Sequence, residues 1–473
     1  MNNLDEVEKF LSQTWELLKS YERRSVDQPI LKTNRPAEVK QQLDTNFPSG
    51  NLAFEELLKE FEQQILPYLN LNTDARYGAY ITGSGNRVSA LAEFIKGYYN
   101  QNALKWNNSP IASELELLVV SWIAEFVGLS DFSEGFLTSG GSMSNLMCLH
   151  LALAHRYPDR EMTGLSHAPS FTVYCSDQTH SSIDRAMVFL GLGRNNLRKI
   201  EVNDQFQINI NELESAIKQD IKDGKTPFAL VGNAGTTNTG SVDPLMDLAG
   251  LASQYDLWYH VDGAYGLPAR RQPELHELFA GVEKADSVII NPHKWMYVTF
   301  EASCVLLRHI PTAIHFIPDY LISSGQDRWE SSKHSIELSK EFKALKIWFT
   351  LKYYGASQLT DFIKKDIEQI QLLASYLEKI DNVIIEQMHI LSILCFRWYD
   401  PALTSEENDQ VNVRAVRMIE DEGRIFITGT RLRETTYLRV YFGNPGRRNS
   451  DVQKMAGEIT RVFTNVVASI NTN

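Results

Sequence analysis

Two ionisable side chains follow predicted strands near the middle of this 473-residue chain. Asp262 lies in "HVDGAYG" (260–266), and Lys294 lies 32 residues later in "NPHKW" (291–295). One crossover between parallel strands takes roughly 30 residues. Because the carboxyl ends of parallel strands meet at one edge of an open sheet, both side chains can reach the same ligand crevice.

A lysine and a carboxylate in one pocket are what pyridoxal-phosphate chemistry requires. The lysine amine forms a Schiff base with the cofactor aldehyde and exchanges it for the substrate amine. The carboxylate keeps the pyridine nitrogen protonated, so that the ring accepts the electron pair left on Cα. Alone, a strand-end aspartate is more often a turn cap, and a lysine is nearly always a solvated charge. Together, and flanked by "NPH" and "W", the two residues favour the pyridoxal interpretation.

The segment "TSGGSMSN" (138–145) indicates a glycine turn that opens a helix. Backbone amides at such a helix start bind anions, and the helix dipole favours negative charge there. Gly141, Ser142 and Met143 are therefore predicted to donate amides to the cofactor phosphate, although a Gly-Gly turn before a helix is common. The similar "TGSGN" (82–86) lacks a third glycine and is predicted to be a loop.

Two further polar segments are candidates for the same site. "SDQTHSSIDRA" (176–186) places His180 after a strand, and "GTTNTG" (235–240) places hydroxyl side chains, Thr237 among them, at another strand end. A histidine after a strand is usually a satisfied polar residue, and hydroxyls at a strand end often cap the following turn. Both alternatives stay open from the residues alone.

These segments, in this order, resemble the group II pyridoxal-phosphate-dependent decarboxylases, which include the aromatic-amino-acid, histidine and glutamate decarboxylases. The similarity runs from about 75 to 445 and includes "SPIASELELLVVSWIAEFVGL", "SDQTHSS", "HVDGAYG", "ADSVIINPHKW" and "FKALKIWFTLKYYG". It implies the aspartate-aminotransferase-type (fold type I) α/β fold with a small C-terminal α+β domain, and pyridoxal 5'-phosphate as the cofactor. It also implies decarboxylation of an L-amino acid through a Lys294 Schiff base and a quinonoid.

The resemblance implies roles for the residues of the cofactor site. Lys294 corresponds to the Schiff-base lysine, Asp262 to the partner of the ring nitrogen, and His180 to the histidine that stacks on the ring. Ala264 corresponds to the small residue on the opposite face, and Thr237 to a position near the cofactor hydroxyl. The positions that match phosphate contacts are Gly141, Ser142, Asn291 and His293.

Substrate contacts are less specific. Arg439, in "YLRVYF", aligns with a family arginine that can bind a substrate carboxylate, but by itself it would be a strand residue paired with an acid. Tyr80, Ile81 and Trp106 fall where the family lines its substrate pocket, partly from the other subunit, and could equally be core residues. The motifs lean towards an aromatic substrate, and an acidic one stays possible if Arg439 or Arg87 faces the pocket.

One segment departs from the family pattern. The family's mobile loop usually carries a tyrosine that is implicated in protonating Cα after carbon dioxide leaves. The corresponding residues 322–337, "ISSGQDRWESSKHSIE", contain no tyrosine, and Ser331 or Ser332 takes its place. Tyr320 matches a different family tyrosine. His334, whose side-chain type has a reference pKa near 6.5, is a candidate replacement donor, although a loop histidine is more often merely solvated.

Three functions follow from these observations. The first is an L-amino-acid decarboxylase that releases an amine and carbon dioxide. The second, suggested by the tyrosine-free loop, is a decarboxylation-dependent aldehyde synthase or another pyridoxal enzyme, such as an aminotransferase or a different lyase. The third is a non-catalytic cofactor-binding or scaffold protein, and the intact Lys294, Asp262 and His180 argue against it.

The amino-acid composition limits the kinds of partner that we expect for this protein. The formal net charge of -13 disfavours nucleic acid or an anionic membrane as the main partner, whereas a small amino-acid substrate is compatible with it. The start "MNNLDEVEKF" lacks the plan of a signal peptide, and no apolar run approaches a membrane span. The four cysteines include no CxxC pair, so we expect buried free thiols in a reducing cytoplasm and neither a metal site nor disulfides.

The surrounding elements divide the chain into three predicted parts. Residues 1–74, with "FEELLKEFEQQILPYL", are predicted to be helical, either as a self-sufficient cap or packed on a second subunit. The resemblance implies the second arrangement, in a homodimer. Residues 75–350 alternate helices with apolar strands ("EGFLT", "FTVYCS", "FALVGNAG", "LWYHVDGA", "DSVIINPH"), which predicts a mostly parallel sheet. Residues 351–473 predict a smaller α+β unit with antiparallel strands "ILCFRW", "RIFITGT" and "TYLRVYF".

Overall fold

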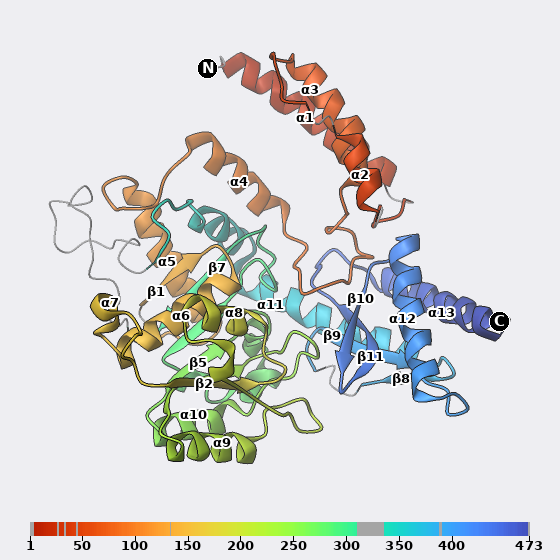
Figure 1. Ribbon diagram of the computed structural model, residues 1–473. Helices are drawn as coiled ribbons and strands as arrows, with labels where there is room; N and C mark the ends of the chain where they lie inside the picture. The colour runs from red at the N-terminus through yellow and green to blue at the C-terminus, as the bar shows by residue number, and fades with distance from the viewer. Residues whose placement is uncertain are drawn as a thin grey trace.

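The protein consists of an N-terminal helical arm, a large α/β unit and a small α+β unit (Figure 1). The computed structural model describes residues 4–25, 28–32, 35–43, 46–132, 134–309, 335–386 and 390–471. In Figure 1 the arm stands away from the body, and the small unit lies beside the large one.

The large unit is built on a seven-stranded sheet with the order β1-β7-β6-β5-β4-β2-β3. Its neighbouring strands pair in parallel except β7, which runs antiparallel to both β1 and β6. The strands are β1 (Glu134–Thr138), β2 (Phe171–Ser176), β3 (Leu197–Ile200), β4 (Thr226–Asn233), β5 (Trp258–Asp262), β6 (Ser287–Ile290) and β7 (Ser303–Leu307). The predicted mostly parallel sheet is confirmed, whereas none of the apolar runs quoted above indicated β3 or β7.

Helices cover both faces of this sheet, which explains why its central strands are continuous apolar runs. One face carries α6 (Gly141–Arg156) and α8 (Ser182–Phe189). The other carries α5 (Pro110–Phe126), α9 (Ile210–Lys222), α10 (Leu245–Gln254) and α11 (Ala344–Leu377). Because successive strand residues point to opposite faces, Val173 and Val231 enter one core while Tyr174 and Leu230 enter the other.

The small unit contains an antiparallel sheet with the order β10-β11-β9-β8. Its strands are β8 (Val383–Ile385), β9 (Ile393–Trp398), β10 (Thr428–Leu432) and β11 (Thr435–Tyr441). The helices α12 (Ser405–Glu422) and α13 (Asn449–Asn471) pack on it together with the C-terminal half of α11. This core is separate from the two cores of the large sheet.

The strand predicted from "RIFITGT" (424–430) is displaced, because β10 pairs with β11 only from Thr428 onward. Of the apolar residues before it, Ile425 and Ile427 enter the core of the small unit, whereas Phe426 turns to the segment that enters the large unit. Gly78 donates its amide to the Phe426 carbonyl at 2.8 Å, and Phe426 donates its amide to the Arg76 carbonyl at 3.2 Å. A long-range partner therefore removes Phe426 from the hairpin that local alternation suggested.

The arm is formed by α1 (Leu4–Ser25), α2 (Pro36–Gln42) and α3 (Phe54–Glu60), which continues through η1 (Phe61–Ile65) and η2 (Leu66–Tyr68). Phe10 stacks on Phe54 with ring centroids 3.9 Å apart, which joins α1 to α3. The helix α4 (Arg87–Tyr99) follows. The remaining short helices are α7 (Arg160–Thr163), η3 (Arg194–Asn196), η4 (Leu267–Arg271), η5 (Pro273–Phe279) and η6 (Val282–Lys284).

Three further features bear on the expectations from sequence. The four cysteines are buried free thiols, as predicted. Among the helices of the described ranges, none combines the length and the apolar character that a membrane crossing requires. The predicted boundary at 350/351 falls inside α11, close to Gly355, where the backbone leaves helical geometry (φ 67°, ψ 170°).

Candidate active site

A cavity of about 460 Å³ opens where β4, β5 and β6 end and α6 begins. Its lining includes all ten residues predicted to contact the cofactor: Gly141, Ser142, Met143, His180, Thr237, Asp262, Ala264, Asn291, His293 and Lys294. A hollow of the same volume beside Arg270 and Asp361 contains none of them. The carboxyl ends of the strands therefore gather distant segments, as parallel topology requires.

Asp262, at the end of β5, is held by a chain of buried polar side chains. Asn145 of α6 donates from Nδ2 to Asp262 Oδ2 at 2.9 Å, and its Oδ1 accepts from His260 Nε2 at 2.8 Å. His260 Nδ1 accepts from Ser287 Oγ at 2.9 Å, and Ser287 Oγ accepts from Trp258 Nε1 at 2.8 Å. Donors and acceptors alternate along this chain when the proton of His260 sits on Nε2.

The ring of His260 is neutral in this chain. Burial lowers the pKa of His260 to about 4, against the attraction of Asp262. Because the imidazole is uncharged, it orients Asn145 without placing a competing cation beside Asp262. The Asp262 carboxylate therefore stays available to a ligand cation in the cavity.

Lys294 begins a tight turn just beyond β6. Its amide donates to the Asn291 carbonyl at 2.8 Å, and Tyr297 donates its amide to the Lys294 carbonyl at 3.2 Å. Burial lowers the pKa of Lys294, while Asp262 acts in the opposite direction. The uncharged amine is the nucleophilic form of lysine, so this environment favours attack on an aldehyde carbon. Gly83, in the predicted loop "TGSGN", packs so closely that a Cβ there would collide with the Lys294 carbonyl.

The first turn of α6 forms the opposite wall of the cavity. The amides of Met143 and Ser144 both donate to the Gly140 carbonyl at 3.0 Å. In an α-helix the first amides lack intrahelical carbonyl partners, which leaves those of Gly141 and Ser142 for an anion. The Met143 amide, predicted from sequence as a third phosphate donor, is engaged within the turn.

Asn291 and His293 lie against this helix start. Asn291 accepts from Ser303 Oγ at 2.6 Å, and a Cβ on Gly141 would lie 2.7 Å from Asn291 Nδ2. A glycine at 141 is therefore required for this close approach. His293 Nδ1 donates to the Ala302 carbonyl at 2.6 Å, and burial, with Lys294 acting in the same direction, lowers the pKa of His293 to about 4.

His180 belongs to the same polar network as Asp262. Ser182 contacts His180 Nδ1 with its amide at 3.2 Å and its hydroxyl at 2.8 Å, and Asn145 donates to the Ser182 hydroxyl at 2.8 Å. Partial burial lowers the pKa of His180, with Asp262 opposing and Lys294 adding to the effect. Ala264 donates its amide to Asp262 Oδ1 at 3.1 Å. One asparagine thus links the two side chains predicted to hold the ring.

Arg439 lies behind the cavity, outside its lining, and is 7% exposed. Its Nη1 donates to the Thr237 carbonyl at 2.9 Å, and its Nη2 donates to Thr428 Oγ1 at 3.2 Å. Its Nη1 also lies 3.4 Å from Asn238 Oδ1, so its partners in the described ranges are neutral oxygens rather than the acid that the strand interpretation predicts. Burial lowers the pKa of Arg439. The geometry makes it a support of the Thr237 segment.

The other residues predicted to contact substrate also lie outside the described lining. Tyr80 is 55% exposed and packs edge-on against Phe426, with centroids 5.9 Å apart. Trp106 Nε1 donates to Glu114 at 2.7 Å, and Ile81 belongs to the core. Arg87 forms an ion pair with Glu22 of the arm at 2.7 Å.

The loop predictions concern residues outside the described ranges. These are Tyr320, Ser331, Ser332 and His334. Their roles stay predictions from sequence.

Comparison with known proteins supplies the class of reaction. A family model described as the pyridoxal-dependent decarboxylase conserved domain matches residues 36–399. The chain belongs to this family. The decarboxylase is 28% identical to an aromatic-L-amino-acid decarboxylase of Bacillus atrophaeus, over 98% of this chain and 97% of that one. It is 30% identical to tyrosine decarboxylase 4 of Petroselinum crispum, over 94% and 91%.

Solved structures agree with the fold of the decarboxylase. A TDC of Oryza sativa with PLP and tryptamine superposes with a TM-score of 0.92, at 23% identity over 98% of both chains. The 4-hydroxyphenylacetaldehyde synthase of Rhodiola rosea superposes with a TM-score of 0.88, at 25% identity over 98% and 99%. The predictions of a fold type I enzyme, pyridoxal phosphate and amino-acid decarboxylation are confirmed.

The cavity of the decarboxylase fits this cofactor. It combines a lysine whose pKa is lowered, a carboxylate fixed by two hydrogen bonds, and a helix start that a Cβ at Gly141 would obstruct. These groups suit an aldehyde, a protonated pyridine nitrogen and a phosphate, respectively.

Asn145 and His260 are the supporting residues that sequence reasoning missed. Both lie within quoted motifs, Asn145 at the end of "TSGGSMSN" and His260 at the start of "HVDGAYG". A histidine inside an apolar strand was the available signal, because a buried polar side chain requires a partner. Phe300 and Glu301 also line the cavity, and no local pattern pointed to them.

Proposed function

We propose that this decarboxylase converts an aromatic L-amino acid to its amine and carbon dioxide, with Lys294 as the residue that binds the cofactor covalently. The observation that supports this most is the shared cavity of Lys294 and Asp262, where burial favours the nucleophilic form of the lysine. When bound, pyridoxal phosphate supplies an electron sink that stabilises negative charge on the substrate Cα.

Several lining residues then have distinct roles toward the cofactor. Asp262 would accept the pyridine N–H, and its hydrogen bonds from Asn145 and Ala264 hold the carboxyl group in one orientation. His180 would pack against the cofactor ring, and burial lowers the pKa of its imidazole. The small Ala264 side chain would leave room for the ring. The residues that hold the phosphate are Gly141, Ser142, Asn291 and His293.

Three observations support an aromatic substrate. Relatives over nearly the whole chain are aromatic-L-amino-acid and tyrosine decarboxylases. Phe300 contributes an aromatic side chain to the cavity lining. The arginines whose exposure to the pocket would favour an acidic substrate are engaged elsewhere, Arg87 with Glu22 and Arg439 with the Thr237 carbonyl.

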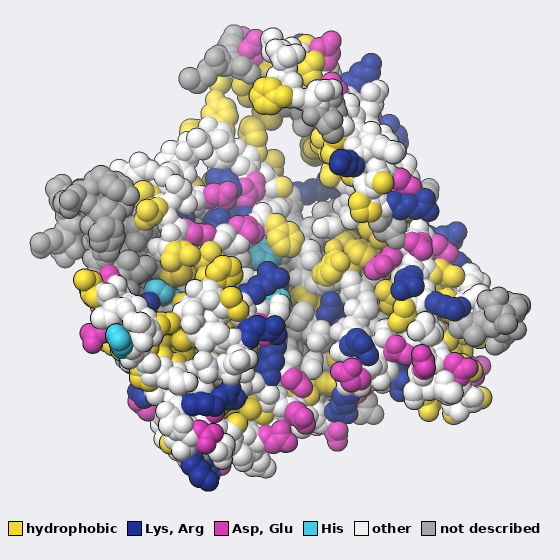
Figure 2. Space-filling model, in the orientation of Figure 1, with side chains coloured by type: hydrophobic (Ala, Val, Ile, Leu, Met, Phe, Trp, Pro, Cys, Tyr) yellow, Lys and Arg dark blue, Asp and Glu magenta, His cyan; other side chains and the backbone are white. Residues whose placement is uncertain are grey.

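The active protein is a homodimer in this proposal. Exposed apolar residues follow helical spacing on α1, at Leu4, Leu11, Trp15 and Leu18, and on α4, at Leu91, Phe94 and Tyr98. Figure 2 shows hydrophobic side chains on the arm and on the part of the body nearest to it. Contiguous apolar surface of this kind marks an interface. In the dimer, Tyr80 and Trp106 would contribute to the substrate pocket.

The finer organisation belongs to the same proposal. The functional parts are the arm (1–74), the cofactor-binding unit (75–350) and the small unit (351–473). Four buried free thiols are compatible with a cytoplasmic location, where cysteines stay reduced.

A second product class is favoured by one specific feature. Residues 322–337 contain no tyrosine, and a relative with a matching fold is an aldehyde synthase. Without a loop acid that protonates Cα promptly, dioxygen would oxidise the substrate after carbon dioxide has left. Hydrolysis by water would then release an aldehyde and ammonia, with dioxygen reduced to hydrogen peroxide.

Product analysis tests both classes. Cofactor-loaded protein is incubated in air with pooled L-amino acids, and the products are identified by mass spectrometry together with oxygen uptake. We expect an amine lighter than an aromatic parent by one carbon dioxide, and an aldehyde with ammonia would assign the second class instead. Lys294→Ala should release neither amine nor aldehyde and should lack the absorbance of the bound cofactor. Lys218→Ala, on the surface of α9, should retain both the product and the absorbance. Turnover by Lys294→Ala would refute the assignment of Lys294.

A further inference from the structure

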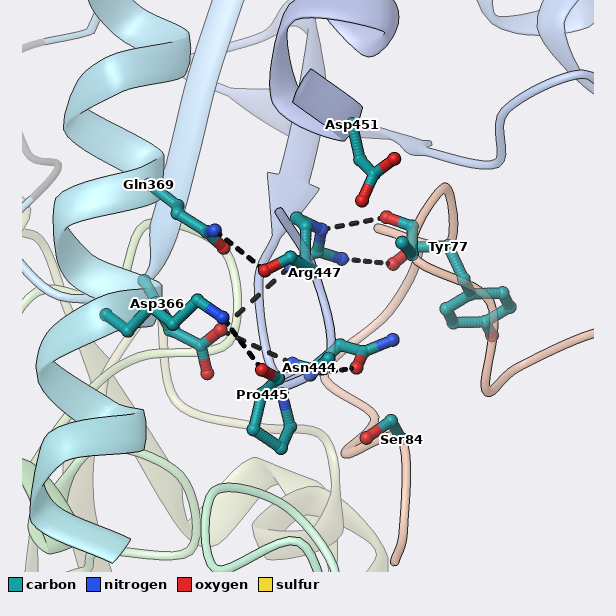
Figure 3. Close-up of polar contacts among 12 residues, drawn as sticks. Tyr77, Ser84, Asp366, Gln369, Asn444, Pro445, Arg447 and Asp451 are labelled. Carbon is teal, nitrogen blue, oxygen red and sulfur yellow. Dashed lines mark hydrogen bonds and ion pairs between the residues drawn. The ribbon is translucent and has the colours of Figure 1, made fainter. Parts of the chain in front are cut away.

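A buried polar cluster connects the Lys294 turn to the small unit and to the segment 73–84. Figure 3 shows the part of the cluster around Asp366, Asn444 and Arg447. Asp366 of α11 and Arg447, which precedes α13, are both 0% exposed. Their closest charged atoms, Arg447 Nη1 and Asp366 Oδ1, are 4.0 Å apart. In Figure 3 Arg447 lies between Asp366 on one side and Tyr77 on the other.

Asp366 holds the residues that immediately follow the cofactor lysine. Trp295 Nε1 donates to Asp366 Oδ2 at 3.1 Å, and Tyr297 OH donates to the same oxygen at 2.7 Å. Tyr297 adopts φ 57°, a backbone region that residues other than glycine rarely occupy, so its side-chain anchor matters. Trp295 also stacks on Tyr265 of the cavity wall, with centroids 5.0 Å apart.

Arg447 holds the second segment that reaches Lys294. Its Nε donates to the Ala75 carbonyl and its Nη2 to the Tyr77 carbonyl, each at 2.8 Å. Asn444 connects the two halves, since its amide donates to Asp366 Oδ1 at 3.3 Å and its Nδ2 to the Thr73 carbonyl at 3.0 Å. The segment then continues to Gly83, which packs against the Lys294 carbonyl.

Stability alone does not account for this pair. Burial raises the pKa of Asp366 and lowers that of Arg447 to about 10, although each opposes the shift of the other. Well-packed apolar side chains often serve stability as well as a buried ion pair does. What they cannot supply is a set of directional bonds to two chain segments at once.

We propose that Asp366 and Arg447 are positioning residues, which fix the Lys294 turn against the segment 73–84 and so couple the small unit to the cofactor lysine. The inference goes beyond the proposed function and depends on it only through the role of Lys294. Neither residue lines the cavity, so both act through the backbone that carries the lysine.

Hydrogen–deuterium exchange of the holoenzyme tests the inference without reference to any substrate. Asp366→Asn keeps one oxygen and replaces the other by an amide donor, so either the Trp295 and Tyr297 donors or the Asn444 amide loses its acceptor. In both cases Arg447 loses the negative charge that faces it. We expect at least a tenfold faster exchange in peptides covering 292–298 and 73–78. Misplacement of a reacting group by about 1 Å costs on the order of 100-fold in rate, so kcat should fall about 10- to 100-fold while KM changes less.

Asp220→Asn is the matched control. Asp220 is likewise buried, accepts from Tyr174 OH at 2.8 Å and pairs with Arg198 at 2.9 Å beside β3. Asp220→Asn should lower the unfolding midpoint and leave kcat and exchange at 292–298 unchanged. Tyr297→Phe, which removes a single donor to Asp366, should speed exchange in the same peptide even if Asp366→Asn does not fold.

The outcomes separate a positioning role from a structural one. If Asp366→Asn, or Tyr297→Phe in its place, retains wild-type exchange at 292–298 and loses no more activity than Asp220→Asn, the cluster is only structural and the inference fails. If the wild type releases neither amine nor aldehyde, the proposed function fails, and the exchange data still decide the inference.

Discussion

Gly141→Ala should weaken cofactor binding through one defined contact. The added Cβ would lie 2.7 Å from Asn291 Nδ2 and 3.3 Å from Asn291 Oδ1. Asn291 has little freedom to move away, because it is 2% exposed and its Oδ1 accepts from Ser303 Oγ at 2.6 Å. The substitution therefore pushes the start of α6 away from Asn291, at the part of the cavity that the phosphate is proposed to contact.

The size of the effect follows from the packing. Extra atoms in a well-packed site typically cost about 1–3 kcal/mol. If the strain falls on the phosphate contacts, the dissociation constant of the cofactor rises about 5- to 150-fold, at about 1.4 kcal/mol per tenfold. Alanine is also a better helix residue than glycine by about 1 kcal/mol, so loss of α6 would not explain weaker binding.

Reconstitution of the apoenzyme with increasing pyridoxal phosphate, followed by absorbance, measures this dissociation constant. Gly250→Ala is the control, because Gly250 lies in α10 and nothing lies within 4 Å of its added Cβ. Gly250→Ala should bind the cofactor like the wild type and unfold at a slightly higher temperature. If Gly141→Ala also binds like the wild type, the assignment of this helix start to the phosphate is wrong.

Three further outcomes are expected. Burial lowers the pKa of His260 and of His293 to about 4, so below pH 6.5 protons bind the unfolded chain more readily than the folded one. Each histidine therefore lowers the free energy of unfolding by up to about 3 kcal/mol as the pH falls from 6.5 through 4. Urea unfolding should show this loss, and the free energy of unfolding should depend less steeply on pH in His260→Gln. Glu116→Gln should lower the free energy of unfolding by about 3–5 kcal/mol in chemical denaturation, because it leaves the charge of the buried Lys340 side chain without its carboxylate. The double variant with Lys340→Met should regain part of this free energy. Trp15→Glu should shift the sedimentation coefficient from dimer to monomer, and an unchanged value would remove α1 from the interface.

The sequence by itself determined the chemistry of this protein. Lys294 and Asp262 each follow an apolar strand, and parallel topology brings strand ends together whatever the intervening residues are. The Gly141 turn is equally local, since a helix start needs only its own backbone to bind an anion. Such features are visible in short windows, and all ten residues assigned to the cofactor line one cavity.

The tertiary structure decided what surrounds that chemistry. Asp366 holds the turn of Lys294 from 72 residues further along the chain, and Arg447 reaches the Tyr77 carbonyl across 370. The loop at Gly83 packs on the Lys294 carbonyl, and Phe426 leaves a predicted strand for the same segment. No periodicity records such contacts, because they depend on which distant donors and acceptors the packed cores leave facing each other.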